Sequence, residues 1–425
     1  MIRSLAKVSS RARPVFSNAQ KVRFSTKSWV LEETEEWSIF PRQREGNIYV
    51  HNWSMCEDGV APVGDAYRNA RLQLLTTAMG AKVNGGKIEQ TSPQYFGKYE
   101  IDEAGDHLTH EMFSEIFSTQ QQYLSSGLDL YVEDAVLGSD KSTRNGVRVT
   151  SCVPALTLIA RSLLIPTPPY KVDHRARFKG WNFDPRWSTK VRPVWNGKHY
   201  DHSDKLPPVP QPGQRPIVAF VGNEHSVSAV QFVEDKGEIV GANVIVGAKV
   251  PVRGFIDAVG HAGCVLANTQ HPNAVALPCM SLTKGADTAV VLGADDEILN
   301  AAAKAGLLYG AYHNIISPDG VSAMWGGYIA DAADAQETLI GSTATPVVVV
   351  AGKAAVHNYP NNIAHPAKHI VFYEKGAAKS KISADEAVKR VVLLSEDTKT
   401  DAINAILKGA SISIIGSPAD LKTIF

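Results

Sequence analysis

The sequence predicts an α/β protein, and two features carry that prediction. Short apolar runs with the composition of buried strands alternate with segments whose apolar residues have helical spacing. Residues 288–293 (Thr-Ala-Val-Val-Leu-Gly) indicate a buried strand that ends in glycine, and residues 297–308, rich in Ala and Leu, indicate the helix after it. Elements that alternate in this way pack as helices on a sheet. We take this strand, loop and helix as the segment around which the chain is organised.

Length and composition allow two domains of ordinary size. The chain has 425 residues, 44% of them hydrophobic, which is ample for a core in each domain. Lys plus Arg and Asp plus Glu both number 43, so the net charge is zero and gives no global electrostatic case for nucleic acid or an anionic membrane. No apolar run reaches the roughly 18 residues that a membrane-spanning helix needs. We expect domains at residues 61–275 and 276–425.

The four cysteines do not suggest a metal or disulfide framework. Cys56, Cys152, Cys264 and Cys279 lie far apart and form no C-x-x-C motif. A reduced, intracellular setting fits this usage best.

The first residues differ from the rest in composition. Seven basic residues lie among Ser, Ala and Val before the first acidic residue, Glu32. An Arg-rich, Ser-rich start without acids is typical of a mitochondrial transit peptide, which we place at residues 1–27, with a matrix-processing pattern at Arg23-Phe24-Ser25. The alternative is a disordered basic tail. Residues 28–60 lack strong periodicity and predict an extended arm.

The elements of the first domain follow in order. Residues 65–79 have helical spacing, and residues 81–98 suggest short strands with turns. A helix is expected over residues 107–125, where His107 and His110 lie three apart; we interpret them as surface residues because no third metal ligand is evident. Two strands are expected within residues 128–151, and a helix over residues 153–164.

Residues 166–216 form an insert that is Pro-rich at both ends and basic and aromatic in the middle. Such a segment behaves as an extended spacer. Its Arg and Trp residues are the types that most often anchor protein interfaces, so we predict that a partner protein docks there. The alternatives are packing on the chain's own domain and contact with single-stranded RNA, against which the balanced charge argues. The candidate partner-binding residues are Arg175, Arg177, Trp181, Trp187, Arg192 and Trp195.

The last part of the chain alternates strands and helices. Buried strands are expected at residues 345–351 and 369–373, helices at residues 383–394 and 398–407, and a final strand at residues 411–415. A capping box at residues 383–386 marks the start of the first of these helices.

The loop between the central strand and helix has the outline of a phosphate-binding loop without its chemistry. Such a loop is Gly-rich and ends in Gly-Lys-Ser/Thr, so that N–H groups and an ammonium surround the phosphates. Here the lysine position is Leu299 and the hydroxyl position is Asn300. Asp295, Asp296 and Glu297 instead stand at the helix N-terminus, where carboxylates stabilise the helix and repel an incoming triphosphate. The loop therefore argues against nucleotide binding, and we expect no cofactor.

Several colinear segments carry a family resemblance. Residues 130–150 read Leu-Tyr-Val-Glu-Asp-Ala-Val-Leu-Gly-Ser-Asp-Lys-Ser-Thr-Arg-Asn-Gly-Val-Arg-Val-Thr. In the same register stand 91–93 (Thr-Ser-Pro), 284–293 (Lys-Gly-Ala-Asp-Thr-Ala-Val-Val-Leu-Gly), 309–313 (Tyr-Gly-Ala-Tyr-His), 319–327 (Asp-Gly-Val-Ser-Ala-Met-Trp-Gly-Gly) and 380–385 (Ser-Lys-Ile-Ser-Ala-Asp). Together they resemble the ATP-dependent phosphoenolpyruvate carboxykinase family. The resemblance, from about residue 80 to 390, implies a two-domain carboxykinase-like α/β fold with a degenerate mononucleotide-binding C-terminal domain.

The resemblance also implies that the family's catalytic groups are missing. Its substrate-binding Arg corresponds to Thr91, its metal-binding His to Pro278 and its metal-binding Asp to Tyr312. Its phosphate-loop Lys and Thr correspond to Leu299 and Asn300. Its transition-state Arg corresponds to Lys381, which keeps the charge but loses the bidentate fork. No catalytic, cofactor-binding or metal-binding residue is therefore assigned.

These expectations favour a catalytically inactive member of the family that acts as an accessory subunit of a mitochondrial complex. We expect it in the matrix or on the matrix side of the inner membrane, without a membrane span. The respiratory chain or ATP synthase is preferred to the mitoribosome because the charge is balanced. The first alternative is a divergent ATP-dependent carboxykinase that converts oxaloacetate to phosphoenolpyruvate. The second is a regulatory module that binds a dicarboxylate or a nucleotide without turnover.

Overall fold

The computed structural model describes most of the chain from residue 109 onward and short stretches before it. The described residues are 38–39, 58–60, 66–68, 70, 72–80, 82–84, 87–90, 109–140, 143, 145–166, 217–223, 228–235, 238–247, 252–331, 347–350, 353–357, 363–394 and 399–425. The expected transit peptide, most of the expected arm, Thr91 and all but the first residue of the insert lie outside them.

The first sheet is mixed and has eight strands. Its order is β1 (Ser38–Ile39), β2 (Ala66–Arg68), β5 (Leu130–Leu137), β6 (Asn145–Ser151), β8 (Ile217–Asn223), β10 (Glu238–Gly247) and β9 (Ser228–Asp235), with β7 (Ile165–Pro166) paired to β5. The pairs β2–β5, β6–β8 and β8–β10 are parallel, and the others are antiparallel.

The second sheet is also mixed and also has eight strands. Its order is β15 (Gly320–Ala323), β14 (His313–Ser317), β11 (Val275–Lys284), β12 (Asp287–Leu292), β19 (Ala367–Tyr373), β21 (Ser411–Ile415) and β20 (Ser380–Lys381), with β13 (Leu308–Gly310) paired to β11. The neighbours β12, β19 and β21 run parallel.

A smaller sheet joins segments that are distant in the sequence. Its five strands have the order β16 (Gly327–Asp331), β18 (Lys353–His357), β17 (Val347–Val350), β4 (Lys87–Gln90) and β3 (Lys82–Asn84). The parallel pair β17–β4 crosses the expected domain boundary at residues 275 and 276, and that boundary stays a prediction.

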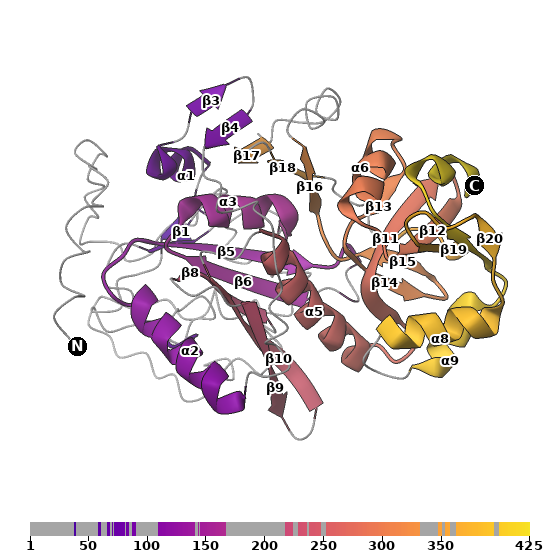
Figure 1. Cartoon of the computed structure of the whole chain (residues 1–425). Helices are drawn as coiled ribbons and strands as arrows, with labels where there is room; N and C mark the ends of the chain where they lie inside the picture. The colour runs from indigo at the N-terminus through magenta and orange to yellow at the C-terminus, as the bar shows by residue number, and fades with distance from the viewer. Residues whose placement is uncertain are drawn as a thin grey trace, which may run out of the picture.

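Helices cover both faces of the first sheet (Figure 1). Alternating side chains of β8 explain this, because Ile217, Ala219 and Val221 belong to the main core while Phe220 belongs to a separate apolar cluster. Helix α2 (His110–Leu124) packs on the Phe220 face. Helices α3 (Pro154–Leu163) and α5 (Val252–Gln270) pack on the other face, and α1 (Leu72–Met79) contacts α3.

The second sheet is also covered on both faces. In β12, Ala289 and Val291 face the main core, whereas Val290 and Leu292 face a second apolar cluster. Helices α8 (Ala384–Leu394) and α9 (Thr400–Leu407) lie side by side on the second cluster (Figure 1). Helix α6 (Asp296–Lys304) and the short 3₁₀ helix η7 (Pro418–Thr423) cover the opposite face. Helix α5 contacts strands of both large sheets, so the two sheets share one core.

The α/β class predicted from the sequence is confirmed, with mixed rather than purely parallel sheets. Two elements were predicted wrongly in part. The helix expected over residues 297–308 ends at Lys304, and Leu308 begins β13. Residues 65–79 form β2 followed by the shorter helix α1, because residues 66–68 pair with the start of β5.

Candidate functional site

The candidate site is the loop between β12 and α6. The strand ends at Leu292, and Gly293 adopts a left-handed φ of 75°. A Cβ on this glycine would lie 2.9 Å from the backbone oxygen of Tyr373, so the close approach of β19 also requires glycine. The backbone therefore turns here as the sequence predicts.

The helix N-terminus is capped by the loop's own carboxylate. Asp295 is the N-cap residue, and its Oδ1 accepts a hydrogen bond from the backbone N–H of Ile298 at 3.0 Å. Asp296 and Glu297 occupy the first turn, where they complement the helix dipole. The prediction that these carboxylates cap the helix is confirmed. An N–H group that could have bound a phosphate is satisfied internally.

Two of these carboxylates also have cations of the same chain as partners. The Nη1 atom of Arg253 lies 3.3 Å from Asp296 Oδ1, and the Nζ atom of Lys375 lies 2.9 Å from Glu297 Oε2. All four side chains are substantially exposed, so solvent screens both pairs and they contribute little to stability. Their effect is electrostatic: both cations nearest to the loop are already neutralised.

The two positions after the acidic residues lie on the inner side of α6. Leu299 is 3% exposed and belongs to the main core, where Leu421 and Ile424 of the C-terminal segment also lie. Asn300 is half-buried, and its Oδ1 has no hydrogen-bond partner in the protein. The side chain of Leu299 thus packs in the core.

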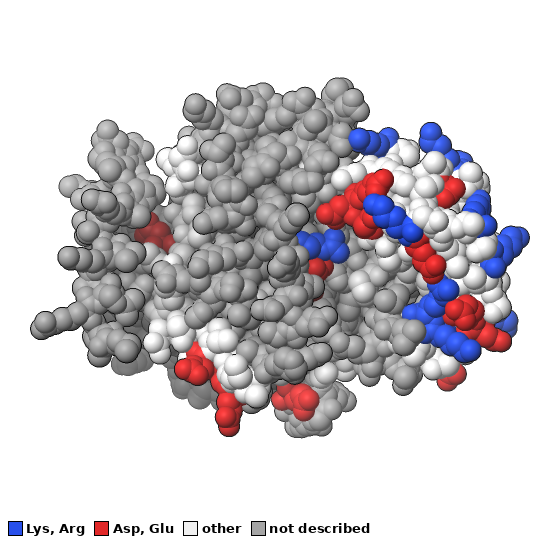
Figure 2. All heavy atoms as spheres, in the orientation of Figure 1, with Lys and Arg blue, Asp and Glu red and all other residues white. Residues whose placement is uncertain are grey.

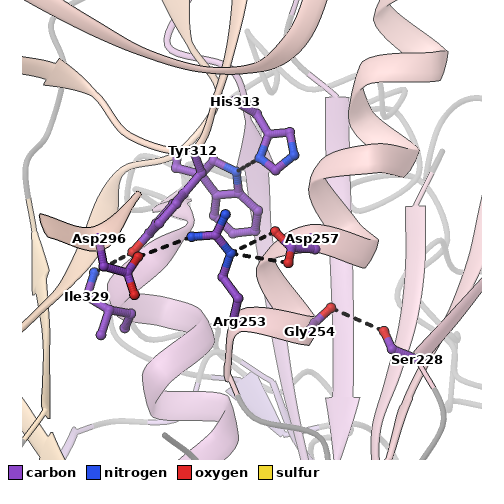
Figure 3. A network of polar contacts seen from close by, with 9 residues as sticks. Ser228, Arg253, Gly254, Asp257, Asp296, Tyr312, His313 and Ile329 are labelled. Carbon is purple, nitrogen blue, oxygen red and sulfur yellow. Dashed lines mark hydrogen bonds and ion pairs between the residues drawn. The ribbon is translucent and has the colours of Figure 1, made fainter. Parts of the chain in front are cut away.

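Arg253 connects α5 to this loop (Figure 3). Its Nε lies 2.9 and 3.2 Å from the two carboxylate oxygens of Asp257, one helical turn further along α5. Its guanidinium also lies over the ring of Tyr312, 5.0 Å from the ring centre. Burial lowers the pKa of Arg253, but Asp257 and then Tyr312 and Asp296 outweigh it and raise the pKa overall. Arg253 therefore stays charged and joins three segments.

Tyr312, for which the sequence resemblance implies a metal-binding Asp position, adopts a strained conformation. Its φ is 58°, which an L-residue other than glycine rarely adopts. Its buried hydroxyl accepts a hydrogen bond from the backbone N–H of Ile329 at 2.7 Å. Burial raises the pKa of this hydroxyl above its ordinary value, so it stays neutral.

His313, the next residue, is buried and neutral. Its Nδ1 accepts a hydrogen bond from the indole N–H of Trp325 at 3.1 Å. The imidazole is labelled in Figure 3. Burial, with Arg253 and His261, lowers the pKa of His313 to about 3. Gly260 of α5 packs directly against the imidazole, where a Cβ would clash. The imidazole is therefore uncharged near neutral pH, with its Nδ1 atom bonded to Trp325.

The remaining predicted positions are spread over the second sheet. Pro278 lies on β11 opposite His313 of β14, with its side chain exposed. Lys381 is exposed on the short strand β20, opposite Ser413. Of the positions at which the resemblance implies a missing catalytic group, Leu299, Asn300 and Tyr312 lie at or near the loop. Thr91 and the six partner-binding candidates of the insert fall outside the described residues.

Sequence reasoning missed Arg253 and Asp257. Their spacing of four residues is the signal of a helical ion pair, but the helix that carries them was not predicted. The partner on α6 lies 43 residues further along the chain, a distance over which no local pattern gives information.

Basic and acidic side chains alternate over the C-terminal part of the surface. Figure 2 shows no large area of one sign among the described residues on this face. Within the described ranges, no group of three or more His, Cys, Asp or Glu residues could hold a metal ion, and no helix is long and apolar enough to cross a membrane. A comparison with protein-family models gives no match for this chain, and a comparison with curated proteins gives none either.

Proposed function

We propose that this chain is a catalytically inactive relative of the ATP-dependent phosphoenolpyruvate carboxykinases and serves as an accessory, structural subunit of a mitochondrial complex. The observation that carries the proposal is the state of the β12–α6 loop. Its helix N-terminus is capped by Asp295, and the position of the phosphate lysine is filled by a core leucine, Leu299.

Electrostatics supports the absence of nucleotide chemistry. Two unit charges of like sign repel by about 4 kcal/mol when they are about 4 Å apart at an effective dielectric constant of about 20. A triphosphate at this loop would meet the carboxylates of Asp295, Asp296 and Glu297. The cations that could offset this repulsion, Arg253 and Lys375, already pair with two of these carboxylates.

The requirements of phosphoryl transfer also support the proposal of an inactive site. That reaction depends on positioning and on stabilisation of charge by cations and metal ions, and loss of one such group costs about 10²- to 10³-fold in rate. In the aligned register, Leu299, Asn300 and Tyr312 replace a lysine, a hydroxyl and a metal ligand. Tyr312 is neutral and engaged with Ile329 and Arg253, so it offers a metal ion no carboxylate.

The proposed location and partners rest on the sequence. Residues 1–27 have the composition of a transit peptide, and the insert at residues 166–216 supplies the Arg and Trp residues that anchor interfaces. A respiratory-chain complex or ATP synthase is the preferred assembly because the net charge is zero.

The first test is native-gel complexome profiling of isolated mitochondria, with this chain followed by mass spectrometry. The proposal expects co-migration with one large complex at a constant ratio. Migration alone or as a small homo-oligomer refutes the subunit assignment.

A second test addresses the inactive site directly by calorimetric titration of the purified chain with ATP, with and without Mg²⁺. We expect no binding heat above that of buffer. A matched variant, Asp296→Asn with Glu297→Gln, separates the two causes that could prevent binding: repulsion by the carboxylates and the absence of a lysine. Weak nucleotide binding by this variant alone means that repulsion dominates, whereas no binding by either means that the missing lysine does. Saturable binding of MgATP by the wild type together with conversion of oxaloacetate contradicts the proposal and favours the divergent enzyme.

A further inference from the structure

Helix α2 presents a stripe of three side chains to the first sheet. Phe117, Gln120 and Leu124 follow one another at helical spacing, so they share one face. The Phe117 ring lies 5.0 Å from the ring of Phe220 on β8, and Leu124 is fully buried in the cluster that contains Phe220. Gln120 lies between these two anchors and is completely buried. An amide side chain is thus held inside an apolar helix–sheet interface.

The strand under this stripe contributes a second polar group. In the sheet register, Thr150 of β6 stands opposite Val132 on β5 and Phe220 on β8. Both neighbours belong to the cluster that packs on α2. Thr150, which is 1% exposed, therefore directs its side chain to the face of the first sheet on which α2 packs.

Neither side chain has a hydrogen-bond partner in the part of the chain that the structure describes. The Oε1 and Nε2 atoms of Gln120 and the Oγ1 atom of Thr150 are all buried without one. Buried polar atoms are nearly always satisfied by protein or by ordered water, because an unpaired group keeps its full desolvation penalty. All three atoms belong to the interface between α2 and the first sheet, and ordered water is the partner that buried polar groups take when the protein supplies none.

We propose that Gln120 and Thr150 form an internal binding site for water between α2 and the first sheet. A water molecule both donates and accepts hydrogen bonds, and the amide offers it one donor and one acceptor while the hydroxyl offers either. Internal waters make about three hydrogen bonds to such groups. An ion is disfavoured because the nearest charged residue on the same face of β6, Arg148, is already paired with Asp134 and Asp58. The enclosing rings and aliphatic side chains exclude bulk solvent.

A double-mutant cycle tests the site in the full chain. The variants are Gln120→Leu, Thr150→Val and the two together, and unfolding in urea is followed by circular dichroism. Gln122→Leu is the matched control, since it makes the same change on the exposed face of the same helix.

If water bridges the two groups, each single change lowers stability, because it leaves the water and the remaining group with too few partners. The double variant removes the site and is less destabilised than the sum of the singles, by about threefold or more in the unfolding equilibrium constant. A crystal structure of the wild type then shows ordered water density between α2 and β6, and the double variant shows none.

Two results overturn the proposal. If each single change stabilises the protein and the two effects add, the polar atoms are unpaired and no molecule bridges them. If native mass spectrometry finds an organic molecule that dissociates only on denaturation, and the density between α2 and β6 matches it, the site binds that molecule rather than water.

Discussion

The sharpest prediction concerns Arg148, which lies on β6 with 1% of its side chain exposed. Its Nε and Nη2 atoms donate to the two carboxylate oxygens of Asp134 at 2.7 and 2.8 Å, and its Nη1 lies 3.2 Å from Asp58. Burial alone lowers the pKa of Arg148, but Asp134 and then Asp58 raise it overall, so the cation persists. Asp58 belongs to residues 58–60, which this contact ties to the sheet.

Arg148→Met removes the cation and keeps the length of the side chain. Two carboxylates then remain in a nearly water-free place without their partner, and breaking a buried pair in this way costs about 3–5 kcal/mol. We expect that loss in urea unfolding followed by circular dichroism. The double variant Arg148→Met with Asp134→Leu recovers part of it, because a buried ion pair replaced by apolar residues is often neutral.

The control is Arg390→Met. Arg390 also pairs with two carboxylates, Glu386 at 2.9 Å and Glu374, but it is 30% exposed and its partners are 46% exposed. An exposed network of this kind contributes about 1 kcal/mol or less. If Arg148→Met costs no more than Arg390→Met, the argument that burial makes the Arg148 network indispensable is wrong.

Two further predictions concern the candidate site. His313 has a pKa of about 3 in the folded chain against an ordinary 6.5, so between these pH values the unfolded chain binds a proton that the folded chain does not. The contribution of His313 to stability is therefore fully present above pH 6.5 and is lost by up to about 1.4 kcal/mol per pH unit as the pH falls toward 3. Unfolding titrations should find this slope reduced in His313→Asn. Leu299→Lys introduces the lysine that the sequence resemblance implies at this position. It should destabilise the chain by about 3 kcal/mol or more, because it buries an ammonium in the core, with no gain of ATP binding. Leu299→Met should cost less than about 1.5 kcal/mol. Saturable ATP binding by Leu299→Lys is the contrary result.

The sequence predicted the three parallel strands of the second sheet and one of its helices because their signals are local. The expected strands at 288–293, 369–373 and 411–415 correspond to β12, β19 and β21, and the expected helix at 383–394 corresponds to α8. Each is a continuous apolar run or a capped amphipathic segment, and such patterns need no information from distant residues.

Helix α5 could not be predicted because tertiary contacts explain its composition. Gly260 packs against the His313 imidazole, and Gly263 packs against Met324 and Leu137. Glycine weakens a helix by about 1 kcal/mol relative to alanine, so these positions reduce the helical signal. Only the folded structure shows that α5 needs them to approach both large sheets.

The candidate site also combines a feature that the sequence predicts with contacts that it does not. The cap by Asp295 was predictable, since a carboxylate reaches N–H groups three residues away. The contacts of Arg253 with Asp296 and Tyr312 were not, since they join residues 43 and more positions apart.

The distribution of strain in the structure bears on where any residual function would lie. Functional sites usually break a local rule of folding, which the surrounding structure offsets. The β12–α6 loop keeps the usual backbone rules: glycine stands at the left-handed position, Asp295 caps the helix and Leu299 is buried. Its exception is the side chain of Asn300, whose Oδ1 has no hydrogen-bond partner among the described residues. Tyr312 does break one, with a φ of 58°, and the Ile329 hydrogen bond and the Arg253 guanidinium hold it in place. In this chain the strained position therefore serves internal contacts between helix α5, the loop and strand β16.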